Sequence, residues 1–257
     1  MRNKKTSLRS VTSLLGALLG AALIVATLSH GNVLPVFLNA HGILMVFGGT
    51  LAATMIGVPA EILGLALREL KYVFFPPPAP GGAKLSAEIV ALSAEVRRDG
   101  LIALQKHTDV LRGQGDDFLV FAVEVALENG NPERLRKVLE DGIRQREGTL
   151  NRAAGVFQTM AFLAPMFGLL GTVMGIVGVL KELSNPQAIG PAMAIALTTA
   201  FYGILVAAFI ANPIALRIRA RAQEVRRSCE LIMEGVLGIV TGAVPLQIER
   251  HLKAYAD

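Results

Sequence analysis

Two long apolar blocks alternate with two charged regions along the chain. Residues 11–60 contain no Asp, Glu, Lys or Arg, and residues 156–216 contain only Lys181 and Glu182 of these types. A helix that crosses a bilayer needs about 20 apolar residues, so each block has room for two crossings. The pattern predicts an all-α membrane protein.

Turn-forming residues divide each block near its middle. The first block divides at SHGNVLP, residues 29–35, and the second at KELSNPQAIGP, residues 181–191, because Gly, Asn and Pro favour turns. The division predicts four transmembrane helices, over residues 11–29, 35–58, 156–180 and 190–215. The expected parts are a tail with a transmembrane hairpin (1–60), a cytoplasmic helical insert (61–155), a second transmembrane hairpin (156–216) and a C-terminal helix and tail (217–257).

Basic residues orient the predicted helices. The chain begins MRNKKTSLRS, with four basic residues and no acid, and RIRARAQEVRR follows the last apolar block. A basic start is also typical of a cleaved signal peptide, but here no small-residue cleavage pattern is followed by a soluble chain. The positive-inside rule therefore places both termini and the insert in the cytoplasm.

The insert contains three amphipathic runs. FFPPPAPGGA, residues 74–83, is typical of a semi-rigid linker. After it, Ile89, Leu92, Val96, Leu101 and Leu104 recur as on one face of a helix. A second run covers residues 116–130, and a third begins at a proline suited to a first helical turn. We expect a compact bundle whose last helix continues into the third membrane helix, as the C-terminal tail continues the fourth.

Composition and candidate chemistry narrow the function. The chain is 53% hydrophobic and carries a net charge of +5, which membrane topology explains without nucleic-acid binding, since no basic patch is interleaved with aromatic residues. The four histidines are scattered, and neither a metal-ligand cluster nor a phosphate loop nor a nucleophile–base pair is evident. The sequence therefore predicts neither an enzyme nor a bound cofactor.

The predicted membrane helices hold no carboxylate of their own. If the protein conducts ions, another chain must supply the carboxylate, because an ion path ordinarily needs an ionisable group in the membrane. This chain offers hydroxyls, and Thr172, Thr198 and Thr199 are the candidates. A period of about 3.6 residues places Ala192, Ala196, Thr199 and Gly203 on one helix face. The alternative role of these residues is helix packing, which also favours Thr and small residues.

The ordered set of motifs resembles a known family. FGGTLAATMIGVP (47–59), RRDGLIALQ (97–105), LAPMFGLLGTVMGIV (163–177) and NPQAIGPAMAIALTTAFYG (185–203) occur in this order. Together with the C-terminal segment, they resemble the A subunit of the bacterial flagellar stator, the MotA/PomA family, within the wider MotA/TolQ/ExbB proton channel family. The likeness covers nearly the whole chain.

The resemblance implies an ion-conducting torque generator of the bacterial inner membrane, with no resident cofactor. Family A subunits form a pentamer around two copies of a single-span B subunit (MotB/PomB-like), whose membrane aspartate carries the proton or sodium ion. Ion passage would turn the A ring against a rotor switch protein (FliG-like). By motif, Arg97, with its neighbour Arg98, matches the rotor-facing arginine, Pro165 and Pro213 the two coupling prolines, and Thr172 one ion-path threonine.

Two positions depart from the family pattern. Gln105 stands where a rotor-facing glutamate is usual, and Ala200 stands where a second ion-path threonine is usual, so that Thr199 matches the first. One step along a helix turns about 100°, so Thr198 does not replace the hydroxyl missing at position 200. Fewer hydroxyl oxygens favour protons over sodium, which needs several oxygen ligands. The alternatives are an energiser of an outer-membrane system, like ExbB or TolQ, and a non-conducting membrane scaffold.

Overall fold

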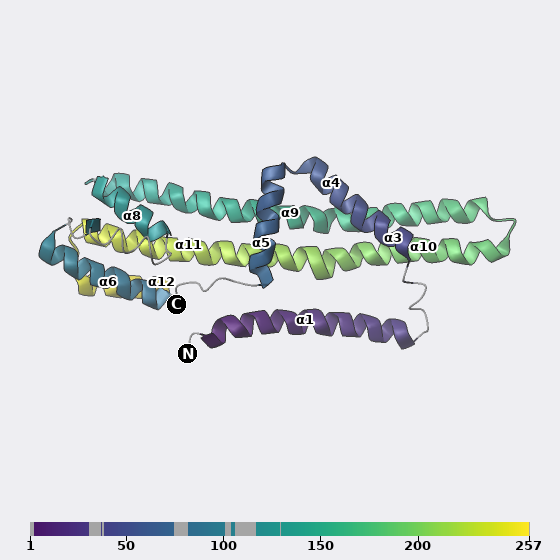
Figure 1. The fold of residues 1–257 in the computed structure, drawn as a ribbon, viewed down its shortest axis with the longest axis horizontal. Helices are drawn as coiled ribbons and strands as arrows, with labels where there is room; N and C mark the ends of the chain where they lie inside the picture. The colour runs from purple at the N-terminus through teal and green to yellow at the C-terminus, as the bar shows by residue number, and fades with distance from the viewer. Residues whose placement is uncertain are drawn as a thin grey trace. The chain divides into compact units, whose positions relative to one another are not determined.

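The computed structural model describes residues 3–30, 37, 39–74, 82–100, 104–105, 117–128 and 130–256. All regular structure in these residues is helical, and no strand occurs among them (Figure 1). The linker predicted at residues 74–83 lies mostly outside this part of the chain. The predicted all-α class is confirmed.

The first apolar block forms two helical segments. Helix α1 spans Asn3–His30. Helices α3 (Ala40–Ile43), η1 (Leu44–Gly48) and α4 (Gly49–Gly57) then follow without interruption, with η1 a single π-helical turn. The side chain of Asn39 caps this run, because its Oδ1 accepts hydrogen bonds from the backbone N–H groups of His41 and Gly42.

The third amphipathic run and the third membrane helix form one helix, as predicted. Helix α9 spans Pro132–Lys181. It begins at the expected proline, and the Asn131 side chain accepts a hydrogen bond from the backbone N–H of Glu133 at 2.9 Å. Its polar first half and apolar second half therefore share one backbone ladder.

The fourth membrane helix likewise continues into the C-terminal region. Helix α10 (Pro186–Leu205), the π-helical η2 (Val206–Ala211) and α11 (Asn212–Val240) follow one another directly. Within η2 the Asn212 N–H bonds to the carbonyl of Ala207, five residues back. Pro213 comes next, and because proline lacks an N–H and crowds the preceding turn, the wider π turn accommodates it.

Within the described residues, three helical runs are long and apolar enough to cross a membrane: 40–57, a part of α9, and a part of the run 189–240. A shorter apolar helix covers residues 18–30. These segments agree with the predicted positions, and the count of four crossings stays a prediction.

The chain forms two compact units. The first, here called the membrane unit, comprises residues 1–77 and 151–219, and the second, the charged unit, comprises residues 78–150 and 220–257. The charged unit contains α6 (Gly82–Asp99), α8 (Asp117–Glu128), α12 (Pro245–Ala256) and parts of α9 and α11. Its core includes Leu85, Ile89, Phe118 and Leu139, together with the lone cysteine, Cys229.

Helix α6 is shorter than the sequence pattern indicated. The apolar spacing predicted one helical face running past Leu104, but α6 ends at Asp99 and Gly100 follows with a φ of 76°. This left-handed conformation suits glycine and ends the helix. Leu104 still enters the same core, fully buried, as do Ile89 and Leu92, and Val96 packs against it. Leu101 lies outside the described residues. The periodicity therefore predicted these four core positions, while the continuous helix was wrong.

A second glycine reverses the chain after α11. Gly242 has a φ of 74°, and the N–H groups of Ala243 and Gly242 bond to the carbonyls of Gly238 and Ile239 at 2.9 and 3.1 Å. These two bonds form a Schellman turn. Pro245 then opens α12, which packs against α6. The sequence pattern alone did not separate α12 from the preceding helix.

Candidate functional site

Helices α9 and α10 approach each other through small residues. A Cβ added to Gly171 would lie 2.5 Å from the Thr199 side chain, and one added to Gly175 would lie 2.5 Å from the Ala196 Cβ. A Cβ on Gly203 would lie 2.6 Å from a backbone oxygen of α9, that of Ala164. Since side chains larger than hydrogen do not fit, the two backbones are in direct contact.

This contact uses the predicted stripe of α10. Ala196, Thr199 and Gly203 face α9 directly, and a Cβ added to Gly178 would lie 3.8 Å from the Cβ of Ala192. The prediction that these α10 residues share one face is confirmed. Within the chain, that face is a helix–helix interface.

Thr199 lies at the centre of the interface. Its side chain is fully buried and its hydroxyl donates to the Ala196 carbonyl at 2.8 Å. On one side it contacts Gly171 of α9, and on the other its methyl group would lie 3.1 Å from a Cβ on Gly42 of α3. Thr199 therefore fills the junction of three helices, and its predicted place on an ion path stays a prediction.

The neighbouring candidates differ in exposure. Thr198 is 1% exposed and donates to the Ala194 carbonyl at 2.9 Å, so its hydroxyl is satisfied by its own helix. Ala200 is half-buried, and a Cβ on Gly168 would lie 3.2 Å from its Cα. Ala200 thus borders the α9–α10 contact.

Thr172 is the candidate hydroxyl that reaches the surface of the chain. It is half-buried and donates to the Leu169 carbonyl at 2.6 Å. A hydroxyl that donates in this way keeps lone pairs with which it can accept a proton or coordinate a cation. Thr172 therefore offers oxygen lone pairs at an accessible position of α9.

The two candidate prolines lie in different surroundings. Pro165 is inside α9, and its Cα would lie 3.0 Å from a Cβ on Gly203. Pro213 is exposed in the first turn of α11, directly after the π-helical turn. Pro165 thus contacts the α9–α10 interface, whereas Pro213 lies at a change in helical winding. Their coupling roles stay predictions.

Several buried polar side chains in the membrane unit were not singled out from the sequence. Tyr202 is 8% exposed, and its hydroxyl accepts a hydrogen bond from the Asn39 N–H at 3.2 Å. Thr50 and Thr54 are each 1% exposed and bond to carbonyls four residues earlier. The sequence did contain one indication of these buried threonines, namely the spacing of four residues between Thr50 and Thr54 within the predicted helix 35–58.

The predicted rotor-facing residues do not share one helix. Arg97 and Arg98 are exposed in the last turn of α6, whereas Gln105 is exposed beyond the break at Gly100. Two guanidinium groups at a helix C-terminus are favourably placed for the helix dipole and remain available to a partner. The structure places these side chains on the surface, and their rotor contact stays a prediction.

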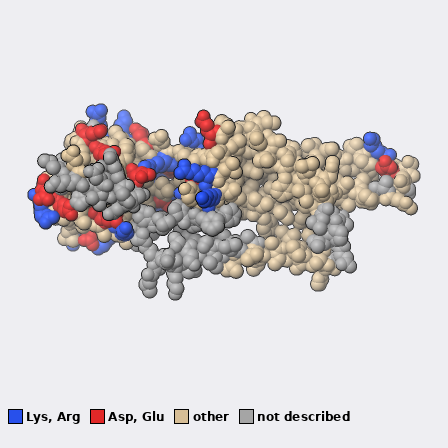
Figure 2. All heavy atoms as spheres, in the orientation of Figure 1, with Lys and Arg blue, Asp and Glu red and all other residues tan. Residues whose placement is uncertain are grey.

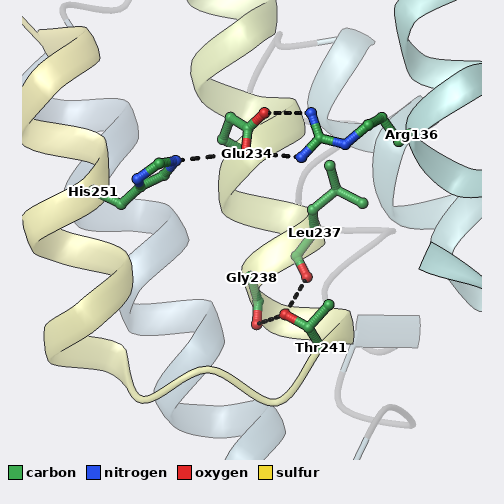
Figure 3. A network of polar contacts seen from close by, with 6 residues as sticks. All are labelled: Arg136, Glu234, Leu237, Gly238, Thr241 and His251. Carbon is green, nitrogen blue, oxygen red and sulfur yellow. Dashed lines mark hydrogen bonds and ion pairs between the residues drawn. The ribbon is translucent and has the colours of Figure 1, made fainter. Parts of the chain in front are cut away.

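A charged network joins three helices of the charged unit (Figure 3). Both terminal nitrogens of Arg136 on α9 donate to the Glu234 carboxylate on α11, at 2.7 and 3.2 Å, and Nε2 of His251 on α12 lies 3.5 Å from the same carboxylate. The hydrogen bond to Glu234 raises the pKa of Arg136 above its usual value, although partial desolvation opposes the shift. The network fastens α12 beside α9 and α11.

A cavity of about 530 Å³ opens beside this network, lined by residues such as Leu237, Ile248 and Leu252 as well as Arg136 and Glu234. Among the described residues, no group of three His, Cys, Asp or Glu side chains is placed to hold a metal ion. In the view of Figure 2, the described atoms of α10 and of the second half of α9 are almost free of charge up to the turn that joins them. Within residues 156–216, charge is therefore confined to Lys181 and Glu182 at this turn.

Two known proteins are similar to this chain in sequence over nearly its whole length. The chain is 28% identical over 248 residues to the chemotaxis protein PomA of Vibrio alginolyticus, covering 96% of this chain and 95% of PomA. It is 31% identical to YtxD of Bacillus subtilis, covering 94% of this chain and 89% of that protein.

A solved structure, that of C. jejuni MotAB, has a chain that matches with a TM-score of 0.82 and 26% identity, covering 94% of this chain and 95% of that chain. Residues 112–230 also match the profile of the MotA/TolQ/ExbB proton channel family. The matched span includes all of α9 and α10, whose backbones meet at the glycine-rich contact. The chain belongs to the MotA/TolQ/ExbB proton channel family.

Proposed function

We propose that this chain is the ion-conducting A subunit of a flagellar motor stator. The observation that carries the proposal is the match to PomA and to a MotAB chain over more than nine-tenths of the length. The long helices α9 and α10–α11 support it, because apolar segments with polar continuations suit a protein that links ion flow to work outside the bilayer. The chain acts as a channel component and not as an enzyme.

The partner supplies the chemistry that this chain lacks. Residues 156–216 hold only Lys181 and Glu182 as charged side chains, and both are exposed at the α9–α10 turn. An aspartate on a single-span, MotB-like subunit would carry the ion, while Thr172 contributes oxygen lone pairs beside it and Thr199 keeps α9, α10 and α3 in register. Protons are the favoured ion, because sodium needs more oxygen ligands than these.

Assembly and force transfer follow from the same proposal. The A subunits form a pentamer in the inner membrane around two B subunits, with both termini in the cytoplasm. Arg97 and Arg98 meet an acidic surface of a FliG-like rotor protein, and oppositely charged surfaces steer such encounters. Pro165 lies at the α9–α10 contact and Pro213 directly after the π-helical turn, so we expect them to couple ion occupancy to helix movement.

Motility of a strain with no other stator tests the proposal. The chain is expressed with its single-span partner, and swimming speed is measured against sodium concentration and a proton uncoupler. We expect restored swimming that the uncoupler abolishes and sodium does not affect. Wild-type membrane levels without swimming or ion uptake would contradict the proposal, and restored energy-dependent uptake across the outer membrane would favour the energiser alternative.

Single substitutions assign roles within the stator. Thr172→Val should reduce ion uptake more than Thr198→Val, because Thr172 is half-buried and accessible whereas Thr198 is 1% exposed. Arg97→Glu should reduce torque without reducing ion uptake, because the side chain is exposed at the end of α6. Unchanged swimming in both Thr172→Val and Arg97→Glu would remove the support for these sites.

A further inference from the structure

Helix α5 (Ala60–Phe74) turns away from the membrane helix that precedes it. Val58 has extended backbone angles, φ −123° and ψ 128°, as expected for a residue before proline, and the N–H groups of Ile62 and Leu63 bond to the Pro59 carbonyl. Figure 1 shows α5 running across the direction of α9 and α10. A helix that runs across the direction of the membrane spans is oriented along the plane of the membrane.

One face of α5 is fixed to the membrane unit. Ala66 is 2% exposed and Glu69 is 6% exposed. The guanidinium of Arg217, at the start of the basic segment of α11, donates to the Val73 carbonyl at 3.1 Å. This bond satisfies a carbonyl in the last turn of α5 and holds that end of the helix beside α11.

The rest of α5 presents an apolar stripe and a basic edge. Leu63, Leu67 and Leu70 recur at spacings of four and three residues and so share one side, where Leu67 is 67% exposed. Arg68 and Lys71 follow on the adjoining side, both exposed, and neither pairs with an acid in the described part of the chain. Leu63 and Leu70 are half-buried. A leucine stripe that is exposed at its centre and lies beside exposed cations is the pattern of a helix in a membrane interface.

We propose that α5 is a membrane-interface helix that binds the headgroups of anionic phospholipids. Leu63, Leu67 and Leu70 enter the boundary between headgroups and acyl chains, and Arg68 and Lys71 contact lipid phosphates at the surface. We take a phospholipid as the ligand because the leucine stripe and the cations lie side by side. A phospholipid has an apolar part for the leucines and a phosphate for the cations, whereas a free phosphate could use only the cations. This surface of α5 includes no residue of the α9–α10 contact and neither of the exposed arginines of α6.

A single tryptophan reports the position of α5. The chain contains no tryptophan, so Leu67→Trp introduces one emission signal. The full-length variant is reconstituted in phosphatidylcholine vesicles with or without phosphatidylglycerol. Bromine atoms, which quench tryptophan emission, are placed on the acyl chains of one lipid at a time. We expect strong quenching at position 67 and stronger quenching by brominated phosphatidylglycerol. Leu246→Trp on α12, where the leucine is 55% exposed, is the matched control and should not be quenched.

Charge removal tests the lipid preference. In the Leu67→Trp background, Arg68→Gln should lower the preference for phosphatidylglycerol about fivefold, the factor that one basic residue gives near an anionic surface. Lys71→Gln should act similarly, and the pair Arg250→Gln and Lys253→Gln, with the same spacing on α12, should have no effect.

Three outcomes would overturn the proposal. Absence of quenching at position 67 in folded protein would remove α5 from the interface, and would point to a neighbouring subunit as the covering surface. Equal quenching by both lipids would remove the role of Arg68 and Lys71. Loss of the preference with inorganic phosphate, but not with chloride at equal ionic strength, would assign the site to free phosphate.

Discussion

In the charged unit, Phe118, Leu231 and Ile232 fill the core and each is 1% exposed, whereas α9 and α10 of the membrane unit meet through glycines such as Gly171 and Gly203. In water, large apolar side chains are drawn together because burial removes them from solvent. In lipid that force is missing between helices, and association depends on close packing of backbones. Large side chains therefore stabilise the charged unit, whereas small residues stabilise the contact in the membrane unit. The following substitutions test this difference, from the largest expected effect to the smallest.

Truncating a core aromatic should damage the charged unit most. Phe118→Ala removes a ring that contacts Phe121 and lies 4.9 Å from the Arg146 guanidinium, and should lower the free energy of unfolding by about 3–5 kcal/mol. Thermal unfolding of the detergent-purified chain measures the loss. Leu127→Ala at a 38% exposed position is the control, and an equal loss there would break the comparison.

Enlarging a glycine should damage the membrane unit. Gly203→Ala places a methyl group 2.6 Å from the Ala164 carbonyl oxygen, and since this neighbour is backbone, the change should cost about 1–3 kcal/mol. Gly190→Ala on the same helix meets nothing within 4 Å and is the matched control. Both variants are compared by thermal unfolding and by the amount inserted in membranes. Equal behaviour would argue against direct backbone contact.

The ion pair of the charged unit should contribute less than its core. Arg136 is 47% exposed, so solvent screens its bond to Glu234, and a double-mutant cycle of Arg136→Gln and Glu234→Gln should give about 0.2–1 kcal/mol. The coupling should fall as salt increases. The more exposed pair of Arg144 with Asp141 should give less, and the reverse order would show that burial does not set the strength of these pairs.

Removing the hydroxyl of Thr199 should affect stability least. Thr199→Val keeps the shape that fits Gly42 and Gly171, and the lost bond to the Ala196 carbonyl should cost about 0.6 kcal/mol or less. Thr199→Leu, which adds volume, should be far more destabilising in the same thermal assay. If Thr199→Val also leaves ion uptake unchanged, the residue acts in packing alone.

The sequence was sufficient for features that depend on local pattern. Apolar length located the membrane segments, Pro132 marked the start of α9, and helical periodicity placed Ala196, Thr199 and Gly203 on one face. The partner of that face could not be predicted, because many helix surfaces in a membrane protein are apolar and only the tertiary structure brings the glycines of α9 opposite them.

The points at which a single glycine ends a helix were predicted less well from the sequence. Gly100 ends α6 within a run whose apolar spacing continues, and Gly242 reverses the chain before α12. Glycine tolerates both helical and left-handed angles, so its presence alone does not decide between them. Because Gly100 has left-handed backbone angles, α6 ends before Gln105. Gln105 therefore does not continue the helix that carries Arg97, although the sequence pattern placed both on one helix.

The backbone contact at Gly203 also limits how the protein can change during evolution. No residue is smaller than glycine, so substitution at this position can only add volume against α9, while exposed apolar residues such as Leu197 and Ile204 on the same helix have many acceptable replacements. Lineages can therefore alter the outer surface of α10 one residue at a time. At Gly203 the neighbour is the Ala164 backbone oxygen, so no side-chain change on α9 makes room for added volume and the two helices would have to move apart.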